Sequence, residues 1–233
     1  MKTWPGRPPR TPRPFSISRK DMAFPLINKA YPLILASASP RRMELLTQIQ
    51  IPFRVVASDV DEQETGDKPT EVCLGLAEKK TIQVHRLAGP AWVLGADTIV
   101  VIARRILGKP RDEADSREML ALLAGTGHRV ITGFCVIDPS GLQAHSEAVS
   151  TDVRFKPLSD REIEAYVRTG EPVGKAGAYA IQGMGAFMVE SISGSYSNVV
   201  GLPVCALIKA LIRVGAIETF PLTPSSQTRN IFR

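Results

Sequence analysis

At 233 residues with 44% hydrophobic and 22% charged residues, the chain is neither fibrous nor wholly disordered in composition, and we expect one compact domain. Its apolar runs, such as Trp92 to Leu94 and Val199 to Leu202, are too short to cross a bilayer, so no transmembrane helix is expected. Of the net charge of +6, most lies in residues 1 to 21, which hold six cations against one Asp and leave 23 cations and 22 anions elsewhere. The basic balance therefore does not indicate a nucleic-acid-binding domain.

Residues 1 to 30 contain six prolines among scattered arginines, and this composition predicts a disordered arm. A mitochondrial transit peptide would share the Arg and Ser content, but it should form an amphipathic helix, which the prolines oppose. A start of translation at Met22 is a third interpretation. Residues 31 to 217 form the expected domain, and residues 218 to 233 are expected to be a loose tail.

From Tyr31 onward, short apolar runs alternate with amphipathic stretches, which predicts a strand, helix, strand opening. The strands expected in the first half are Leu33 to Ala36, Phe53 to Val56 and Ala91 to Leu94, followed by a second apolar run at Ile99 to Ile102. The helices expected there are Pro40 to Ile49, Pro69 to Leu87 and Asp112 to Leu123.

The second half begins with two long strands, Arg129 to Ile137 and Ala148 to Phe155, which predict an antiparallel hairpin. Ser159 and Glu162 then predict a capping box at the start of a helix that ends at Val167. A strand at Phe187 to Ile192 and a helix at Pro203 to Val214 complete the pattern. The fold class expected is α/β, with a mixed sheet, flanking helices and two lobes around a central cleft.

Cys73, Cys135 and Cys205 are far apart, odd in number and set in apolar surroundings. This usage favours buried thiols in a reducing compartment over disulfides or a metal knuckle. We therefore expect three core cysteines and a cytoplasmic location.

The run from Ala36 to Arg42 lies where the first strand meets the first helix. Ser39 suits the N-cap and Pro40 the first helical position. Two arginines beside the positive end of a helix dipole are unfavourable unless an anion binds there. A phosphate held by Ser37, Ser39, Arg41 and Arg42 would meet this need, whereas the alternative is a plain capped helix whose arginines lie in water or pair with Glu44.

Gly95, Ala96, Asp97 and Thr98 follow a buried apolar run, which predicts that Asp97 and Thr98 lie at the carboxyl end of a strand. Ligands often bind at such strand ends in α/β proteins, although a turn Asp bonded to nearby amides is the more common case. One member of the acidic cluster Asp59, Asp61, Glu62 and Glu64 could complete a magnesium or manganese site with Asp97.

Isolated lysines are usually surface charge, and Lys80 and Lys109 become of interest only beside a polyphosphate. The glycine-rich stretch from Gly170 to Gly183 would let backbone approach a ligand closely. Within it, Gln182 carries a donor and an acceptor that could contact the edge of a base. A structural loop with a surface glutamine is the alternative.

In combination, these motifs resemble those of the Maf (septum formation inhibitor-like) nucleotide pyrophosphatases, over residues 33 to 216. The resemblance rests on runs in the family's order, which are Ala36 to Arg42, Gly95 to Thr98, Gly108 to Pro110, His128 to Gly133, Lys175 to Gly183 and Gly194 to Pro203. It implies a fold similar to that of Maf and inosine triphosphatase proteins, and a homodimer. The run from Lys175 to Gln182 resembles the branch that prefers dTTP and UTP, although Gly174 stands where many members have Asp.

The resemblance also implies a role for each site residue. Asp97 matches the catalytic carboxylate, with Glu62 as a second acidic position at a Mg²⁺ or Mn²⁺ ion. Residues that influence which base is accepted are matched by Arg42, Thr98 and Gln182. Phosphate contacts are matched by Arg41, Lys80 and Lys109. We expect a deep cleft lined by Ser37 to Arg42, Asp97, Lys109 and Gln182.

The function expected is hydrolysis of dTTP or UTP, and of modified nucleotides, to the monophosphate and pyrophosphate. No Gly-Lys-Ser/Thr sequence ends a glycine-rich turn, so a Walker-type kinase or motor is not indicated. A nucleotide-binding regulator of septum formation without turnover is the alternative, and a nucleic-acid-binding module is a weaker third option. A nucleoside triphosphate is thus the expected partner, and neither a membrane nor a nucleic acid is expected.

Overall fold

The computed structural model describes residues 24–61 and 68–222, and these form one mixed seven-stranded sheet with helices on both faces. The strand order is β2-β1-β3-β5-β6-β7, and β4 also pairs with β3. The strands are β1 (Leu33–Leu35), β2 (Phe53–Val55), β3 (Val93–Ile102), β4 (Arg105–Leu107), β5 (Gly127–Ile137), β6 (Gln143–Phe155) and β7 (Val189–Ser193). The predicted α/β class with a mixed sheet is confirmed.

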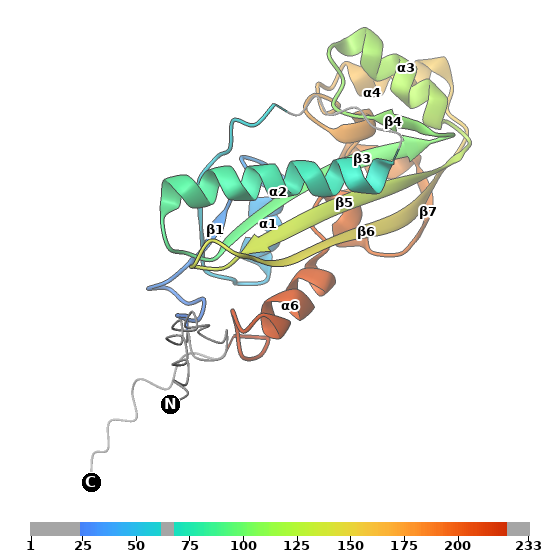
Figure 1. Cartoon of the computed structure of the whole chain (residues 1–233). Helices are drawn as coiled ribbons and strands as arrows, with labels where there is room; N and C mark the ends of the chain where they lie inside the picture. Colours follow the sequence, from blue (N-terminus) through green and yellow to red (C-terminus); the bar gives the residue numbers. More distant parts are fainter. Residues whose placement is uncertain (1–23, 62–67, 223–233) are drawn as a thin grey trace, which may run out of the picture.

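Long helix α2 (Pro69–Ala88) runs along one face of the sheet over β3 and β5 (Figure 1). The other helices are α1 (Pro40–Gln48), α3 (Glu113–Leu123), α4 (Asp160–Val167), α5 (Tyr196–Val200) and α6 (Val204–Arg213), with 3-10 turns at Ala176–Ala178 and Met184–Met188. The main core packs these five helices against the face of the sheet opposite α2. None of the helices in the described ranges has the length and apolarity that a membrane span requires.

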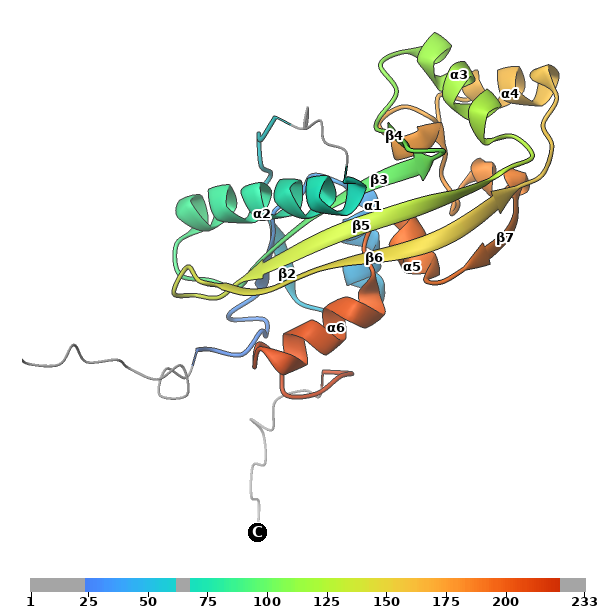
Figure 2. The same cartoon turned by 45° about the vertical axis from the view of Figure 1, so that its right-hand side comes forward.

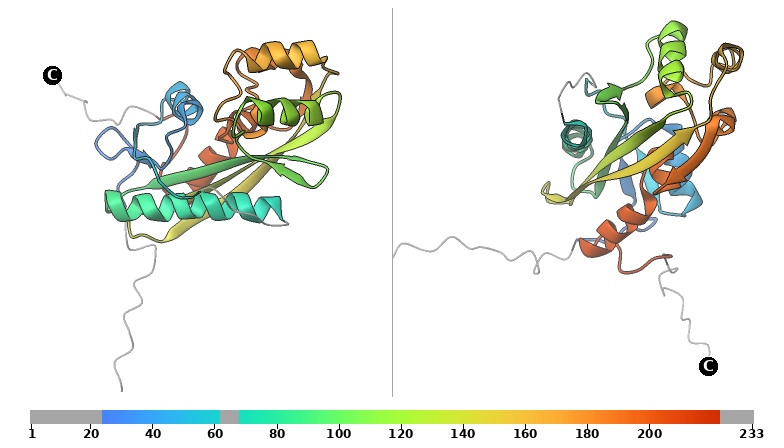
Figure 3. Two further views of the ribbon diagram at one scale, coloured as in Figure 1. Left: turned by 90° about the horizontal axis from the view of Figure 1, so that it is seen from above. Right: turned by 90° about the vertical axis from the view of Figure 1, so that its right-hand side faces the viewer.

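The long strands β3, β5 and β6 connect two lobes. One lobe carries β1, β2, α1 and α6, and the other carries β4, α3 and α4 at the far end of the long strands (Figure 2). Seen from above, α1 lies on the opposite side of the sheet from α2, and α3 and α4 lie side by side (Figure 3). The two lobes of the expected fold are therefore present.

Helix α2 packs closely on the sheet because two glycines face it. A Cβ on Gly95 of β3 would lie 2.2 Å from Thr81 Oγ1 and 2.6 Å from the Ala77 carbonyl oxygen. A Cβ on Gly133 of β5 would lie 2.8 Å from the Cys73 carbonyl oxygen. Both glycines therefore serve close backbone approach in a strand rather than a turn.

This packing corrects the predicted position of Asp97 and Thr98. Instead of following the end of a strand, both residues lie inside β3, which pairs without interruption with β5 from Val93 to Val101. The sequence pattern suggested a break because Gly95 and Asp97 follow a continuous apolar run. The glycine instead admits α2, and Asp97 meets a cation of that helix.

One edge of β3 is only partly covered. Strand β5 pairs with the other edge of β3. On this edge, β1 pairs with β3 as far as Leu94, and β4 pairs with β3 from Val100 onward. Between these two points no strand of the described chain pairs with the edge. Residues 95 to 99 of β3, named here the open edge, therefore face the space beyond the carboxyl end of β1.

Most predicted elements are confirmed, including the antiparallel β5–β6 hairpin and the capping box of Ser159 and Glu162. Some bounds differ. Strand β6 begins at Gln143 rather than Ala148, and the strand expected at 187 to 192 is a 3-10 turn followed by β7. Helix α5 was not predicted. Cys73 and Cys135 are buried as expected, whereas Cys205 lies exposed on α6.

The expected arm and tail both need correction where the structure describes them. Pro25 accepts a 2.9 Å hydrogen bond from Trp92 Nε1, and Ile27 is 3% exposed and donates to the Ala216 carbonyl at 2.8 Å. Phe220 and Leu222 pack against the main core. Residues 24 to 30 and 218 to 222 thus belong to the folded body, and residues 1–23 and 223–233 lie outside the described residues.

The close packing of α2 on Gly95 generates a stability prediction. We expect Gly95→Ala to lower the free energy of unfolding by about 2 kcal/mol, because the added methyl group must displace Thr81 or the backbone of α2. Chemical denaturation measures this change. Gly127→Ala is the matched control in a strand, because its Cβ meets nothing within 4 Å. Equal stability of the two variants would contradict the packing argument.

Candidate functional site

The turn between β1 and α1 carries the first group of predicted site residues. Ser39 occupies the N-cap position and Pro40 the first turn, as predicted, but the Ser39 side chain makes no capping hydrogen bond. Ser37 Oγ instead accepts from the Ser39 amide at 3.3 Å and from Arg42 Nη1 at 2.9 Å. Ser37 therefore fixes the shape of this turn through its hydroxyl.

Arg42 is only 7% exposed and connects three separate elements. Besides Ser37, its guanidinium donates to the Gly201 carbonyl at 2.8 Å, through Nε, and to Thr98 Oγ1 at 3.1 Å, through Nη2. Multidentate bonding of this kind suits the rigid donor geometry of arginine. Arg42 thus holds α1, the middle of β3 and the C-cap of α5 in one arrangement.

A second layer of hydrogen bonds supports Thr98. Thr98 Oγ1 lies 3.0 Å from Thr132 Oγ1, and Thr132 donates to the Asn198 carbonyl at 3.0 Å. The buried Asn198 side chain donates in turn to the Val130 carbonyl and to Thr151 Oγ1. The sequence analysis assigned no role to Thr132, Asn198 or Gly201. Asn198 and Gly201 lie in the Gly194 to Pro203 motif, which was the signal that could have identified them.

Asp97 lies on the other face of β3 and pairs with a cation of α2. Lys80 Nζ is 2.6 Å from Asp97 Oδ1, and the two side chains are 5% and 9% exposed. The Cys73 thiol donates to the Asp97 carbonyl at 2.9 Å, and burial raises the pKa of Cys73 to about 12, so the thiol is uncharged. Lys80, predicted as a phosphate contact, therefore also balances the charge of Asp97.

The two groups of side chains meet at the open edge. Successive residues of a strand point to opposite faces, so Asp97 and Lys80 lie on the α2 side and Thr98 and Arg42 on the side of the main core. Because no described strand covers this stretch of β3, a ligand at the open edge could contact both sides. The edge thus lies beside both groups, and of its residues Thr98 is half-buried and the others are buried.

A pocket on the side of the main core is lined from both lobes. Arg41 of α1 and Thr98 of β3 line it together with Lys175, Tyr179 and Gln182, which follow α4 in the chain. The structure thus brings three predicted residues together, namely Arg41, Thr98 and Gln182. Asp97 is not part of this lining.

The segment that carries Lys175 and Gln182 is anchored at several points. The Glu171 carboxylate accepts from the amides of Met184 at 3.0 Å and Gly185 at 2.9 Å. Tyr179 Oη lies 2.9 Å from Nε2 of His128, whose pKa burial lowers to about 4, so that its ring is neutral. These contacts hold the second lobe's side of the pocket in place.

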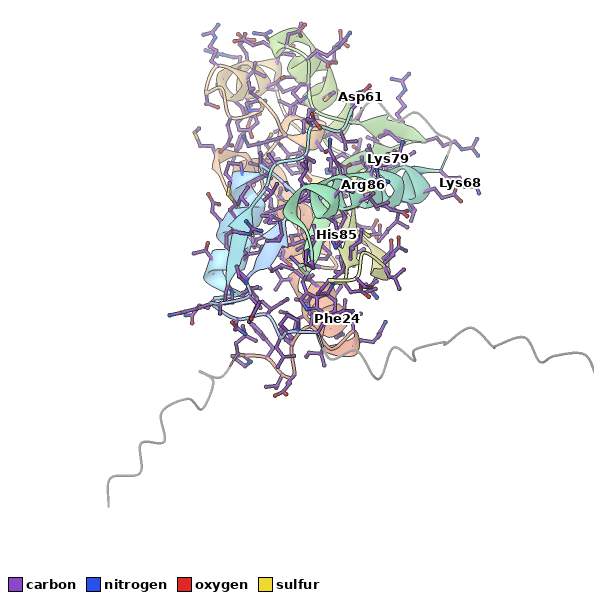
Figure 4. The ribbon with its side chains drawn as sticks, turned by 60° about the vertical axis from the view of Figure 1, so that its left-hand side comes forward. Phe24, Asp61, Lys68, Lys79, His85 and Arg86 are labelled. Carbon is purple, nitrogen blue, oxygen red and sulfur yellow. The ribbon has the colours of Figure 1, made fainter. Side chains whose placement is uncertain are left out.

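The remaining predicted residues lie nearby or outside the described chain. Lys109 is exposed after β4, next to Gly108, whose carbonyl accepts from the Gly177 amide at 3.0 Å. Glu62 lies outside the described residues. Asp59 of the same acidic stretch exchanges hydrogen bonds with Gln83 of α2, and Figure 4 shows Asp61 in the loop beside that helix.

The described residues form no group of three His, Cys, Asp or Glu side chains that could hold a metal ion by themselves. Asp97 is nevertheless able to act as one oxygen ligand. Its Oδ1 contacts Lys80, while Oδ2 accepts no hydrogen bond from the described part of the chain. A cation there would need substrate oxygens or water as further ligands.

Sequence comparison identifies relatives over nearly the whole folded body. The family model described as Maf-like protein matches residues 32–214. The dTTP/UTP pyrophosphatase of Geotalea uraniireducens (strain Rf4) is 54% identical over 187 residues, covering 80% of this chain and 96% of the relative. The proteins of the same name from Geobacter sulfurreducens and Halalkalibacterium halodurans are 51% and 47% identical, covering 79% and 77% of this chain and 97% and 94% of their own lengths.

Among solved structures, the Ham1 protein of Staphylococcus aureus aligns with 68% of this chain and 79% of its own, at 15% identity and a TM-score of 0.38. This similarity is too low to add to the sequence comparison. The matched family model covers most of the chain, and the relatives are about half identical over nearly their full lengths. The chain therefore belongs to the Maf family.

Proposed function

We propose that this chain hydrolyses nucleoside triphosphates to the monophosphate and pyrophosphate, with dTTP and UTP preferred and modified forms as further substrates. The observation that carries the proposal is the buried Lys80–Asp97 pair at the open edge, one residue from the Thr98–Arg42 contact. A carboxylate and several cations beside a strand edge that no described strand pairs with suit the cleavage of a phosphoanhydride. Membership of the Maf family and the names of the relatives agree with this activity.

In the proposed mechanism, Asp97 takes a proton from the water that attacks the α-phosphorus. Lys80 contacts Asp97 and holds the carboxylate in place. Arg41 and Lys109 then stabilise the negative charge that develops on the leaving pyrophosphate. Thr98 and Gln182, with Arg42 behind Thr98, shape the contact with the base.

We also propose a Mg²⁺ or Mn²⁺ ion at Asp97, with Glu62 as a further ligand. The donor set fits, because Mg²⁺ usually takes one or two carboxylates and completes its ligands with substrate phosphates and water. When bound, such an ion supplies positive charge to the phosphate oxygens. The homodimer, the cytoplasmic location and the assignment of the catalytic activity to one domain around residues 31 to 217 stay predictions.

A nucleotide-binding regulator without turnover is the alternative function. It would retain the pocket of Arg41, Thr98 and Gln182, but it would have no need of a buried carboxylate beside a lysine. Burying such a pair is costly for a protein, so its presence favours catalysis. Pyrophosphate release measured across a panel of nucleotides distinguishes the two, since the regulator would release none from any of them.

We expect Asp97→Asn to lower kcat by at least about 10³-fold while the protein stays folded, because the amide keeps an oxygen for Lys80 but is no base. Pyrophosphate release from UTP and dTTP, with circular dichroism as the folding control, measures this. Asp160→Asn, at an exposed carboxylate of α4, is the matched control and should keep full activity. A kcat of Asp97→Asn close to that of the control would remove Asp97 from the mechanism.

We expect Gln182→Ala to change the ratio of kcat/KM for UTP and GTP by about two- to tenfold, the value of one hydrogen bond between neutral groups. Activity on the better substrate should change less than in Asp97→Asn. Gln48→Ala, at an exposed position of α1, is the control. If the UTP to GTP ratio stayed constant, or if activity on all nucleotides fell equally, Gln182 would not select the base.

A further inference from the structure

Helix α2 contacts Asp97 at two points, and the mechanism above uses only one of them. Lys80 bonds to the carboxylate of Asp97. About two turns earlier on the same helix, the Cys73 thiol donates to the backbone carbonyl of Asp97 at 2.9 Å. Cys73 is 0% exposed, so water does not compete for the thiol. The helix therefore holds both the side chain and the main chain of this residue.

The thiol also connects β3 with its neighbour β5. Asp97 pairs with Gly133 across the two strands, and Cys73 Sγ accepts from the Gly133 amide at 3.0 Å while it donates to the Asp97 carbonyl. The Ile131 carbonyl, at 3.4 Å, is a more distant acceptor for the same proton. An uncharged thiol can donate and accept at once. Cys73 thus fixes the Asp97–Gly133 pair to α2.

The packing around Cys73 places the thiol directly over this pair. A Cβ on Gly133 would lie 2.8 Å from the Cys73 carbonyl oxygen, so only a glycine lets the helix approach β5 this closely. The buried side chains that cluster with Cys73 are those of Ile99, Val101 and Ile131. Since these side chains are apolar, the printed hydrogen bonds of the thiol all go to the backbone of β3 and β5.

The backbone of β3 is held from one side only at Asp97. Strand β5 pairs with this stretch, whereas no described strand pairs with residues 95 to 99 on the open edge. A displacement of about 1 Å in a reacting group can lower the rate about 100-fold. A bond from α2 to the Asp97 carbonyl therefore restrains the backbone at the point where the sheet restrains it least.

We propose that Cys73 is a positioning residue for the reaction, which holds the backbone of Asp97 so that the carboxylate keeps its place beside Lys80. It acts through Asp97 and not through contact with the substrate. The inference rests on the proposed function, because Cys73 has this role only if Asp97 acts in catalysis. A thiol that merely fills space under α2 would stabilise the fold without affecting turnover, and this difference defines the test.

The test measures kcat and KM for pyrophosphate release from UTP by the full chain. We expect Cys73→Ala to lower kcat about tenfold and to change KM by less than about twofold, because the carboxylate moves while the pocket keeps its lining. Cys73→Ser should recover most of the lost kcat, since a hydroxyl also donates and accepts. Cys135→Ala is the matched control, because it removes another buried thiol under α2. It should keep the full kcat even if it lowers stability as much.

A double-mutant cycle tests whether Cys73 acts through Asp97. In an Asp97→Asn background, Cys73→Ala should lower kcat no further, whereas an independent effect would lower it tenfold again. Such an additive fall would overturn the proposal. So would a kcat of Cys73→Ala equal to that of Cys135→Ala, or a Cys73→Ser variant no more active than Cys73→Ala.

A spectroscopic measurement keeps the proposal testable if Cys73→Ala fails to fold. A variant with both Cys135→Ala and Cys205→Ala leaves Cys73 as the single cysteine. Its S–H stretching band in the infrared should lie at lower frequency than in the unfolded chain, because donation to a carbonyl weakens the S–H bond. An equal frequency would overturn the proposal. Absence of pyrophosphate release by the unmodified protein would instead overturn the proposed function, and the role of Cys73 with it.

Discussion

The open edge of β3 is the constraint on which the site depends. Strands β1 and β4 pair with the same edge but leave residues 95 to 99 without a partner strand. A strand normally presents its two faces to two separate environments, yet at an uncovered edge side chains of both faces can contact one ligand. Asp97 and Thr98 can therefore act on one substrate although they point to opposite sides of the sheet.

Different contacts hold Asp97 on one face of β3 and Thr98 on the other. On one face, Gly95 and Gly133 let α2 approach closely enough for Lys80 to bond to Asp97. On the other face, the buried guanidinium of Arg42 joins Ser37, Thr98 and the Gly201 carbonyl. Charged groups held in this way are already desolvated and oriented before the substrate binds, which is the condition for electrostatic catalysis.

The two arginines that follow Pro40 are adjacent in the chain but have different surroundings. Arg42 is buried and donates to three acceptors of the protein, whereas Arg41 is half-buried and lines the pocket. The helix places them about 100° apart around its axis, so one faces the sheet and the other the space between the lobes. The anion contact proposed at this helix start therefore belongs to Arg41 more than to Arg42.

The sequence predicted the hairpin of β5 and β6 and the capping box of α4 because hydrophobic alternation and local capping determine them. It placed Asp97 at a strand end because Gly95 looks like a turn residue, and only the position of α2 shows why a glycine is needed there. The bonds of Arg42 with Gly201, and of Thr132 with Asn198, join residues far apart in the chain. No local pattern encodes such contacts, so roles for Gly201 and Thr132 required the fold.

A crystal structure with Mg²⁺ and α,β-methylene-UTP, which resists hydrolysis, tests most directly the claim that substrate binds at the open edge. We expect a triphosphate beside residues 95 to 99 of β3, with Asp97 on one side and Thr98 and Arg41 on the other. Nucleotide bound elsewhere, for example in the hollow between α3 and α4 lined by Arg117 and Arg168, would contradict it.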